Sequence, residues 1–411
     1  MRIYFIKRVG VFIMKELLSK PYANLEEGFL GVILTAAADP NIISFAGGLP
    51  NPKSFPMDAL KESCNNVIDK YESRAFQYSN AQGLPALRQL IAESFNRKYG
   101  TEMDQDNIVI TTGSQQALDL FCKLFLDEGD GILIEKPSYL GALNAFDQFS
   151  PTYYPVTLNE DGLDIDELEE TLEKYGDKIK MVYMVPEFQN PTGLTYTEEN
   201  RAKVSEVLKK YDVVVIEDDP YGKLRFVGEK PSYIGLKKLP IAALLGTFSK
   251  VATPGMRVGY VVTENKELAS YLTKALEAST LHTNIFSQYV LYDYLLNNEQ
   301  EEHEKEIQDL YKQQCEYMLD AMDKYFPDCV QYTRPDGGMF IWATLPEGVS
   351  AAELFPEAAK RGVAYVPGDP FYVDEKDVNT MRLNFTNASK EKIDEGIKIL
   401  GELLTEACAG K

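Results

Sequence analysis

The 411-residue sequence contains few of the residues that build metal centres and disulfide frameworks. It has two histidines and five cysteines, and no two cysteines are spaced as CxxC. An odd number of scattered cysteines argues against a disulfide framework, and two histidines are too few for a histidine-built metal site. We therefore expect no metal ion, and the cysteine usage favours the reducing cytoplasm as the location.

The sequence also lacks an excess of positive charge and a long apolar run. Its formal net charge is -21, so nucleic acid or an anionic membrane surface would be repelled over much of the protein. Near the N-terminus the longest uncharged stretch, Val9–Met14, is too short for the core of a signal peptide or for a membrane span. We expect small-molecule partners and neither nucleic acid nor a membrane.

Two common nucleotide-binding loops are absent as well. The sequence has no GxGxxG segment and no GK[ST] segment, so neither a dinucleotide fold nor a P-loop is supported. The chain is nevertheless long enough for two closely packed domains that enclose a site between them.

Short β-rich runs alternate with amphipathic stretches between about residues 107 and 262. Six runs are typical of buried strands: Asn107–Thr112, Gly131–Ile134, Lys180–Val185, Val213–Glu217, Ala242–Gly246 and Val258–Val262. Helical patterns lie between several of them, at Gln115–Leu126, Tyr139–Phe149 and Glu198–Tyr211. This alternation predicts an α/β fold with a largely parallel sheet covered by helices on both faces. In such a sheet ligands bind at the carboxyl ends of the strands.

The C-terminal part has a different pattern. It begins with a long helical stretch, about Ile285–Tyr325. Candidate strands and a closing helix follow, at Val330–Leu345, Val363–Val366, Thr380–Thr386 and Ser389–Leu404, with Ser389 as N-cap. We interpret this part as a smaller α+β domain packed with the N-terminal segment. The expected division is an N-terminal segment over residues 1–50, a large domain over 51–295 and a small domain over 296–411.

The most informative segment is Thr-Phe-Ser-Lys-Val-Ala-Thr-Pro-Gly-Met-Arg-Val-Gly, which starts at Thr247. It follows a predicted buried strand, so Lys250 lies at a strand end, where apolar surroundings favour a neutral amine that can attack an aldehyde. Arg257, seven residues later, can return to the same place to hold a phosphate. The alternative is an ordinary surface lysine, which is the commoner case.

A second segment, Glu217-Asp218-Asp219-Pro220-Tyr221, directly follows a predicted strand. Neighbouring side chains of an extended chain face opposite ways, so one aspartate of the pair should enter the site. A carboxylate there, with a tyrosine three residues later, suits a protonated pyridine nitrogen and an adjacent phenolate oxygen. A cluster at a helix N-cap is the alternative.

Two more segments place polar groups at strand ends. Pro-Glu-Phe-Gln-Asn-Pro-Thr-Gly, which begins at Pro186, is first of all a turn, and a turn can fix the Asn190 amide so that it donates to a ring oxygen. Thr112-Gly-Ser-Gln-Gln-Ala runs from a strand into a helix. The free amides and the dipole at that helix start can bind a phosphate, and Ser114 adds a hydroxyl.

Together, these segments resemble the fold-type I aminotransferases of class I/II. The motifs, in order, are Gly47-Gly48-Leu-Pro-Asn-Pro, Gln77-Tyr78-Ser, Gly113-Ser-Gln-Gln, Asn190-Pro-Thr-Gly, Asp218-Asp-Pro-Tyr221, Ser249-Lys250 and Arg382-Leu-Asn-Phe. The resemblance spans about Ile42 to Leu404 and is nearest to the branch with 2-aminoadipate, kynurenine and aromatic aminotransferases. It implies a large domain with a mostly parallel seven-stranded sheet and a smaller α+β domain. It also implies pyridoxal 5'-phosphate as cofactor and amino transfer from an L-amino acid to a 2-oxo acid such as 2-oxoglutarate.

The resemblance assigns catalytic roles to three residues. Lys250 resembles the lysine that holds pyridoxal phosphate and later moves the substrate proton. Asp218 resembles the partner of the pyridine nitrogen. Tyr221, together with Asn190, resembles the groups that hydrogen-bond the phenolic oxygen of the ring.

Other residues resemble groups that bind the cofactor or the substrate. The phosphate-binding set is represented by Ser114, Gln115, Ser249 and Arg257. Tyr139 resembles the aromatic residue stacked on the cofactor ring. Tyr78 resembles a tyrosine that reaches the phosphate of the neighbouring subunit, which implies a homodimer with shared active sites. Arg382 resembles the arginine that grips the substrate α-carboxylate, helped by Asn190 and the backbone of Gly48.

One departure from the family pattern concerns substrate choice. Members that act on 2-aminoadipate place an arginine before the Gly-Gly-Leu-Pro motif, whereas no arginine lies between Arg8 and Arg74 here. The corresponding stretch is apolar and carries Phe29, Leu30 and Val32. A carboxylate buried there would lack a partner, and apolar groups would gain from burial. We therefore expect aromatic or large aliphatic amino donors.

Two alternative functions use the same scaffold. C–S lyases share the cofactor and the fold, and an Arg382 clamp on the carboxylate argues against decarboxylation but not against lyase activity. A regulatory domain that binds pyridoxal phosphate without catalysis is the alternative from another class. No basic winged-helix region precedes Ile42, and the net charge is wrong for DNA.

Overall fold

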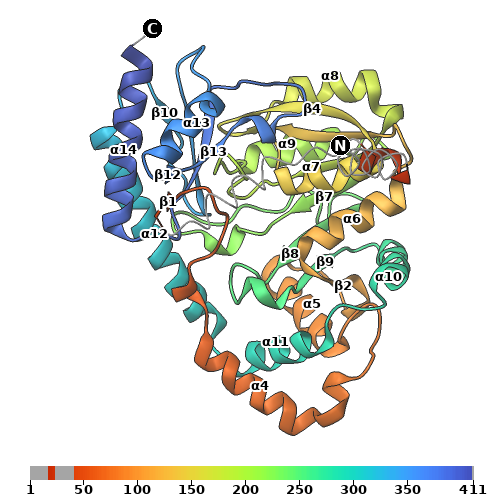
Figure 1. Cartoon of the computed structure of the whole chain (residues 1–411). Coiled ribbons are helices and arrows are strands. Elements are labelled where there is room, and N and C mark those ends of the chain that lie inside the picture. The colour runs from red at the N-terminus through yellow and green to blue at the C-terminus, as the bar shows by residue number, and fades with distance from the viewer. Residues whose placement is uncertain (1–16, 24–40, 410–411) are drawn as a thin grey trace, which may run out of the picture.

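The computed structural model describes residues 17–23 and 41–409. Its central sheet has eight strands: β2 (Ile108–Thr111), β3 (Gly131–Lys136), β4 (Thr152–Asn159), β5 (Gly162–Leu163), β6 (Ile179–Met184), β7 (Val214–Asp218), β8 (Ala242–Thr247) and β9 (Gly259–Val262). Their order in the sheet is β2-β9-β8-β7-β6-β3-β4-β5. Figure 1 labels β2, β9, β8, β7 and β4 of this sheet. The expected α/β fold is confirmed.

The sheet is mostly parallel, as predicted. β8, β7, β6, β3 and β4 pair in parallel, whereas β9 runs antiparallel to both of its neighbours. The expected count of seven strands was wrong by one. The additional strand, β5, has two residues and folds back on β4 with Gly162 opposite Asn159. A strand this short leaves no alternating pattern in the sequence.

Helices cover both faces of the sheet because successive strand residues face opposite ways. Ile132 of β3 joins the larger core, to which α6 (Gly113–Phe125), α7 (Leu140–Phe146) and α10 (Lys266–Thr280) contribute. Leu133 faces the other side, where α8 (Ile165–Tyr175) and α9 (Glu198–Leu208) contribute to a second core. The carboxyl ends of the strands stay uncovered by these layers.

The helical stretch predicted over Ile285–Tyr325 is two helices, α11 (Ile285–Asn297) and α12 (Gln300–Tyr325). The break follows from Asn298, whose backbone is extended and whose Nδ2 donates to the Tyr294 carbonyl 2.9 Å away. α11 packs against α4 (Met57–Tyr71), as Figure 1 shows. Besides the C-terminal helices, the described residues also form α2 (Lys20–Ala23), α5 (Pro85–Tyr99) and eight 3-10 turns, at Pro52–Ser54, Glu72–Phe76, Gln105–Asn107, Asp147–Phe149, Gly176–Lys178, Gly222–Leu224, Pro254–Met256 and Asp369–Phe371.

The C-terminal part has its own sheet. Its strands are β10 (Gln331–Tyr332), β11 (Phe340–Thr344), β13 (Val366–Pro367) and β14 (Thr380–Asn384), in the antiparallel order β10-β11-β14-β13. The helices α13 (Ala351–Lys360) and α14 (Lys390–Ala409) belong to the same part, and α14 lies beside α12 (Figure 1). At the start of α14, Ser389 Oγ accepts from the Lys392 amide at 3.4 Å.

The chain just before the Gly-Gly-Leu-Pro motif joins this C-terminal part. β1 (Ile43–Ser44) pairs in parallel with β12 (Val363–Ala364). Most of residues 1–50, including Phe29, Leu30, Val32 and the stretch Val9–Met14, lies outside the described residues. The division at residues 50 and 295 stays a prediction. Within the described ranges, no helix is both long and apolar enough to cross a membrane.

Candidate active site

The carboxyl ends of β6, β7 and β8 meet at a cavity of about 240 Å³. Nine of the residues singled out in the sequence line it: Ser114, Gln115, Tyr139, Asn190, Asp218, Tyr221, Ser249, Lys250 and Arg257. They come from segments far apart in the chain, and the parallel sheet brings these segments to one edge.

Lys250 follows β8 and reaches across the cavity. Its Nζ donates to the Gly48 carbonyl at 3.1 Å. Burial lowers the pKa of Lys250 to about 8, and the positive charges of Arg257 and Arg382 act in the same direction. A substantial fraction of the amine is therefore neutral near physiological pH, which a nucleophilic or proton-transferring lysine needs.

Asp218 ends β7 with one carboxylate oxygen occupied and one free. Its Oδ2 accepts from the Tyr183 hydroxyl at 3.0 Å. Its Oδ1 is buried and has no hydrogen-bond partner among the described residues. Burial raises the pKa of Asp218 to about 7, and the bond from Tyr183 opposes this rise. A buried oxygen without a partner costs free energy, so its place beside a cavity suits a ligand that brings a donor.

Asp219, the next residue, lies on the other side of the strand end. Its carboxylate accepts from the Gly222 amide at 2.7 Å and from the Tyr233 hydroxyl at 2.8 Å, and it pairs with Lys230. These contacts compensate the charge of Asp219 inside the protein. They leave it out of the cavity lining.

Asn190 connects Tyr221 with Arg382. Its Nδ2 donates to the Tyr221 hydroxyl at 3.2 Å, and its Oδ1 accepts from Arg382 Nη1 at 2.8 Å. Arg382 Nη2 also donates to the Ala46 carbonyl at 2.8 Å, and the guanidinium lies 4.3 Å from the centre of the Phe340 ring. Burial lowers the pKa of Arg382 to about 10, so it stays cationic. Its buried Nε has no hydrogen-bond partner among the described residues.

The opposite end of the cavity is built for an anion. α6 begins there at Gly113, so amides of its first turn, which have no partner within the helix, meet the cavity. Arg257 lies against this turn and donates to the Thr112 carbonyl at 3.4 Å. Gly113 has φ +71, and a Cβ there would lie 2.4 Å from Arg257 Nη2. Glycine is therefore required for the arginine to approach the helix start.

Hydroxyl and amide groups complete this end. Thr247 Oγ1 donates to Ser249 Oγ at 2.9 Å. The Gln115 side chain donates to the Gly141 carbonyl at 2.6 Å, and Ser114 lies on the first turn of α6. These groups and the Arg257 charge can surround a phosphate.

Three of the predicted residues lie outside the lining. Gly48 and Arg382 border the cavity through their bonds to Lys250 and Asn190. Tyr78 is 79% exposed and meets His282 edge to face at 5.9 Å between ring centres. The structure of a single chain therefore does not bring Tyr78 to its own cavity.

A family model described as "Aminotransferase class I and II" matches residues 49–400. The chain belongs to this family. The aromatic-amino-acid aminotransferase 1 of Thermococcus litoralis is 39% identical to this aminotransferase over 408 residues, which cover 96% of this chain and 98% of that protein.

Solved structures agree with this assignment. A kynurenine aminotransferase of Pyrococcus horikoshii, in complex with PMP, has a TM-score of 0.91 and 40% identity, over 96% of this chain and 98% of that one. LysN of Thermus thermophilus, an α-aminoadipate aminotransferase complexed with N-(5'-phosphopyridoxyl)-L-leucine, has a TM-score of 0.87 and 35% identity, over 97% of this chain and 100% of that one. The fold-type I class is confirmed, and neither the lyase nor the regulatory alternative is favoured.

The cavity of this aminotransferase fits pyridoxal phosphate. The unpartnered Asp218 Oδ1 suits a protonated ring nitrogen, Lys250 supplies an amine of lowered pKa, and the Gly113 turn with Arg257 accepts an anion. Pyridoxal phosphate is its cofactor, and pyridoxal-phosphate-dependent transamination is its reaction.

Reasoning from the sequence missed Tyr183 and Thr247. Tyr183 lies in a buried strand and holds Asp218, while Thr247 holds Ser249. A signal was present for Tyr183, because a buried tyrosine needs a partner for its hydroxyl. Thr247 belongs to the Lys250 segment, but no sequence pattern assigned it a role.

Proposed function

We propose that this aminotransferase moves amino groups from aromatic and large aliphatic L-amino acids to 2-oxo acids such as 2-oxoglutarate. It acts in the cytoplasm as a homodimer with shared active sites. The observation that carries the proposal is that Lys250 and Asp218 line one cavity and that Arg382 borders it through Asn190. Asp218 Oδ1 and Arg382 Nε are buried and have no hydrogen-bond partner among the described residues.

The chain holds its cofactor at both ends of the ring. Asp218 would hold the ring nitrogen, Asn190 and Tyr221 would hold the phenolic oxygen, and Tyr139 would contact the ring. The phosphate is held by Ser114, Gln115, Ser249 and Arg257. When bound, the cofactor supplies an electron sink for negative charge at the substrate α-carbon.

Proton transfer falls to Lys250. Because burial lowers its pKa to about 8, Nζ is able to take a proton from the substrate α-carbon and to give it back. Asp218 keeps a negative charge beside the ring nitrogen, since a cationic partner favours the ionised carboxylate. Its Tyr183 bond fixes the direction in which the free oxygen points.

Arg382 binds the substrate α-carboxylate. Its guanidinium is fixed by Asn190, the Ala46 carbonyl and the Phe340 ring, and its buried Nε has no hydrogen-bond partner among the described residues. A fixed guanidinium binds a carboxylate with geometric specificity, so it orients the bond at the α-carbon that must break. The backbone of Gly48 adds a polar group on the same side.

The cavity lining has few cations that could pair with a second carboxylate of the substrate. Among the described residues that line it, the cations are Lys250 and Arg257, and Arg257 lies against the helix start at the phosphate end. A distal carboxylate would therefore stay unpaired, whereas an apolar side chain gains from burial. The apolar residues Phe29, Leu30 and Val32 support this preference from the sequence alone.

A panel of amino donors with 2-oxoglutarate tests the substrate proposal. We expect aromatic and large aliphatic donors to have a higher kcat/KM than 2-aminoadipate and aspartate. The matched pair phenylalanine and aspartate separates an apolar from an acidic side chain on the same acceptor. If aspartate or 2-aminoadipate is the best donor, another cation serves the site and the preference is wrong.

Exposed apolar side chains next to Tyr78 support the homodimer. Phe76 is 64% and Leu281 55% exposed, and Phe76 stacks on Phe286 at 5.1 Å between ring centres. Side chains of this kind are typical of surfaces that a partner covers.

Mixing two inactive variants tests the shared sites. A Tyr78→Ala subunit and a Lys250→Ala subunit should regain part of the activity when mixed, because one site of the hybrid keeps both groups. The matched control mixes Lys250→Ala with Asp218→Asn. Lys250 and Asp218 line the same cavity of one subunit, so each site of the hybrid keeps one substitution and no activity should return. A fully active monomer in sedimentation would contradict the dimer.

A further inference from the structure

A buried carboxylate, Glu135, lies behind the cavity and does not line it. Glu135 belongs to β3 and is 1% exposed. Its Oε1 accepts from the Val185 amide at 2.9 Å and from the Tyr196 hydroxyl at 2.7 Å, and its Oε2 accepts from Gln189 Nε2 at 3.0 Å. Burial raises the pKa of Glu135 to about 7, and these three bonds act against the rise.

Gln189 carries this contact into the turn that holds Asn190. Its Nε2 also donates to the Pro137 carbonyl at 2.9 Å. Its Oε1 accepts from the Thr192 amide at 3.0 Å and from the Thr192 hydroxyl at 2.8 Å. The Gln189 side chain thus ties both sides of Asn190 to the sheet. The preceding Phe188 has φ +48, a backbone conformation that a non-glycine residue keeps only where its surroundings enforce it.

We propose that Glu135 and Gln189 are positioning residues, which fix the turn at Asn190 so that its amide meets Tyr221 and Arg382 together. The proposal rests on the role assigned to Asn190 above. Asn190 needs this support because it makes bonds in two directions, at 3.2 Å to Tyr221 and at 2.8 Å to Arg382. A shift of the turn would lengthen at least one of them.

The hydrogen bonds around position 135 require a carboxylate there, facing the side-chain amide of Gln189. All three side-chain and backbone groups around Glu135 donate to it. A glutamine at this position would turn its own NH2 either toward the Val185 amide or toward Gln189 Nε2, and a buried pair of donors without an acceptor is unfavourable. Glu135→Gln therefore breaks the contact although its shape is nearly unchanged.

Exchanging the two side chains should restore the contact. In Glu135→Gln/Gln189→Glu, the new amide oxygen at position 135 can accept from Val185 and Tyr196, while the NH2 of the same amide donates to the new carboxylate at position 189. The other oxygen of that carboxylate can accept from Thr192, and the one remaining unfavourable contact is with the Pro137 carbonyl, which loses its donor and faces an oxygen instead. Gln189→Glu alone places two carboxylates against each other, which is unfavourable in a buried site. The exchange also keeps the net charge, so an effect of charge on Asp218 is separated from an effect of hydrogen bonding.

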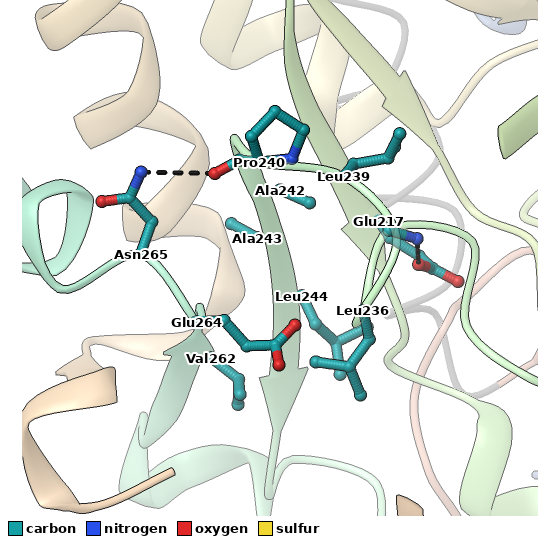
Figure 2. Close-up of a pocket in the computed structure, with 11 residues that line it drawn as sticks. Glu217, Leu236, Leu239, Pro240, Ala242, Ala243, Leu244, Val262, Glu264 and Asn265 are labelled. Atoms are coloured by element: carbon teal, nitrogen blue, oxygen red, sulfur yellow. Dashed lines mark hydrogen bonds between the residues drawn. The ribbon is translucent and has the colours of Figure 1, made fainter. Parts of the chain in front are cut away.

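Glu217 offers a matched control. It is 3% exposed, and burial raises its pKa to about 7 as for Glu135. Its Oε2 accepts from the Ile234 and Gly235 amides at 2.9 and 3.2 Å, which a glutamine oxygen can also do. Glu217 lines a second cavity of about 20 Å³, room for about one water beside an amide. Figure 2 draws Glu217 with the other residues that line this cavity. Arg201, 3.7 Å from Glu217, keeps four other hydrogen bonds.

The experiment measures four quantities on each variant: KM and kcat for the amino donor, the affinity of the cofactor-free protein for pyridoxal phosphate, and the melting temperature. We expect Glu135→Gln and Gln189→Glu each to raise KM and weaken cofactor binding about 10-fold, the size of one buried hydrogen bond turned unfavourable. The exchange variant should recover most of both losses. Glu217→Gln should leave KM and cofactor affinity unchanged, whatever its melting temperature.

Several results would overturn the proposal. Equal changes in KM and cofactor affinity for Glu135→Gln and Glu217→Gln would show a general effect of burial. An exchange variant that regains its melting temperature without regaining KM would show a structural role only. Asn190→Ala separates the role of Asn190 from the positioning role of Glu135. If Asn190→Ala alters neither KM nor cofactor affinity, the role of Asn190 fails and the proposal with it. If Asn190→Ala alters both and Glu135→Gln alters neither, only the positioning role fails. Gln189→Met gives the same answer if Glu135→Gln does not fold.

Discussion

Three successive acidic residues at the end of β7, Glu217, Asp218 and Asp219, differ in the groups that compensate their charge. Glu217 faces Arg201 and two backbone amides, and Asp219 pairs with Lys230 and accepts from Gly222 and Tyr233. Asp218, between them, keeps one buried oxygen without a partner among the described residues. All three side chains are buried, so burial alone does not mark the functional one. Asp218 is therefore the carboxylate that can bind a ligand, because its Oδ1 beside the cavity still lacks a hydrogen-bond donor among the described residues.

The sharpest test of this comparison replaces each aspartate by asparagine. Asp218→Asn removes the charge opposite the ring nitrogen, so kcat should fall about 100-fold or more, with little loss of stability because no ion pair is broken. Asp219→Asn should reduce kcat far less. Steady-state kinetics of the two purified variants provide the measurement. Equal losses of kcat would show that the wrong carboxylate was assigned.

The same pair of variants should show the opposite order in stability. Asp219→Asn leaves Lys230 buried without its counter-ion, and removing one partner of such a pair costs about 3 kcal/mol or more. Asp218 has no cationic partner among the described residues. Denaturant unfolding of the cofactor-free proteins measures the difference, and a larger loss for Asp218→Asn would contradict the account.

A smaller effect is expected from Lys250 in the cofactor-free protein. Its pKa is about 8 in the folded chain, below its ordinary value of 10.5, so between these values the unfolded chain binds more protons and stability rises with pH. Below pH 8 Lys250 is protonated in both the folded and the unfolded chain, so its burial lowers the free energy of unfolding by an amount that no longer changes with pH. Lys250→Met should therefore be more stable than the parent near pH 7, and its advantage should shrink as the pH rises toward 10.5. Melting temperatures across this range test the trend, with the exposed Lys61→Met as control; an advantage that does not change with pH would contradict it.

The sequence predicted those features that depend on short stretches of chain. β6 (Ile179–Met184) and β7 (Val214–Asp218) were found because each contains a short apolar stretch and is followed two residues later by a proline, Pro186 or Pro220. The break between α11 and α12 was missed because the helical pattern continues across Asn298 and only its extended backbone stops the helix. β4 was missed since its exposed and buried residues do not form an apolar run.

The sequence did not predict contacts that depend on the register between strands. Tyr183 reaches Asp218 because β6 and β7 pair with Tyr183 opposite Ile216, two residues before the carboxylate. Glu135 meets Gln189 because β3 and β6 are neighbours in the sheet. No local pattern encodes either contact. The cavity residues named from the sequence came instead from ordered motifs, which mark where strands end.

The most direct test of the central claim is the site of cofactor attachment. The purified protein should be yellow, and borohydride reduction should fix pyridoxal phosphate to one lysine. Peptide mapping is expected to find the label in the Thr247-Phe-Ser-Lys segment, on Lys250, because this amine has the lowered pKa and lines the same cavity as Asp218. Label on any other lysine would contradict the assignment of the site.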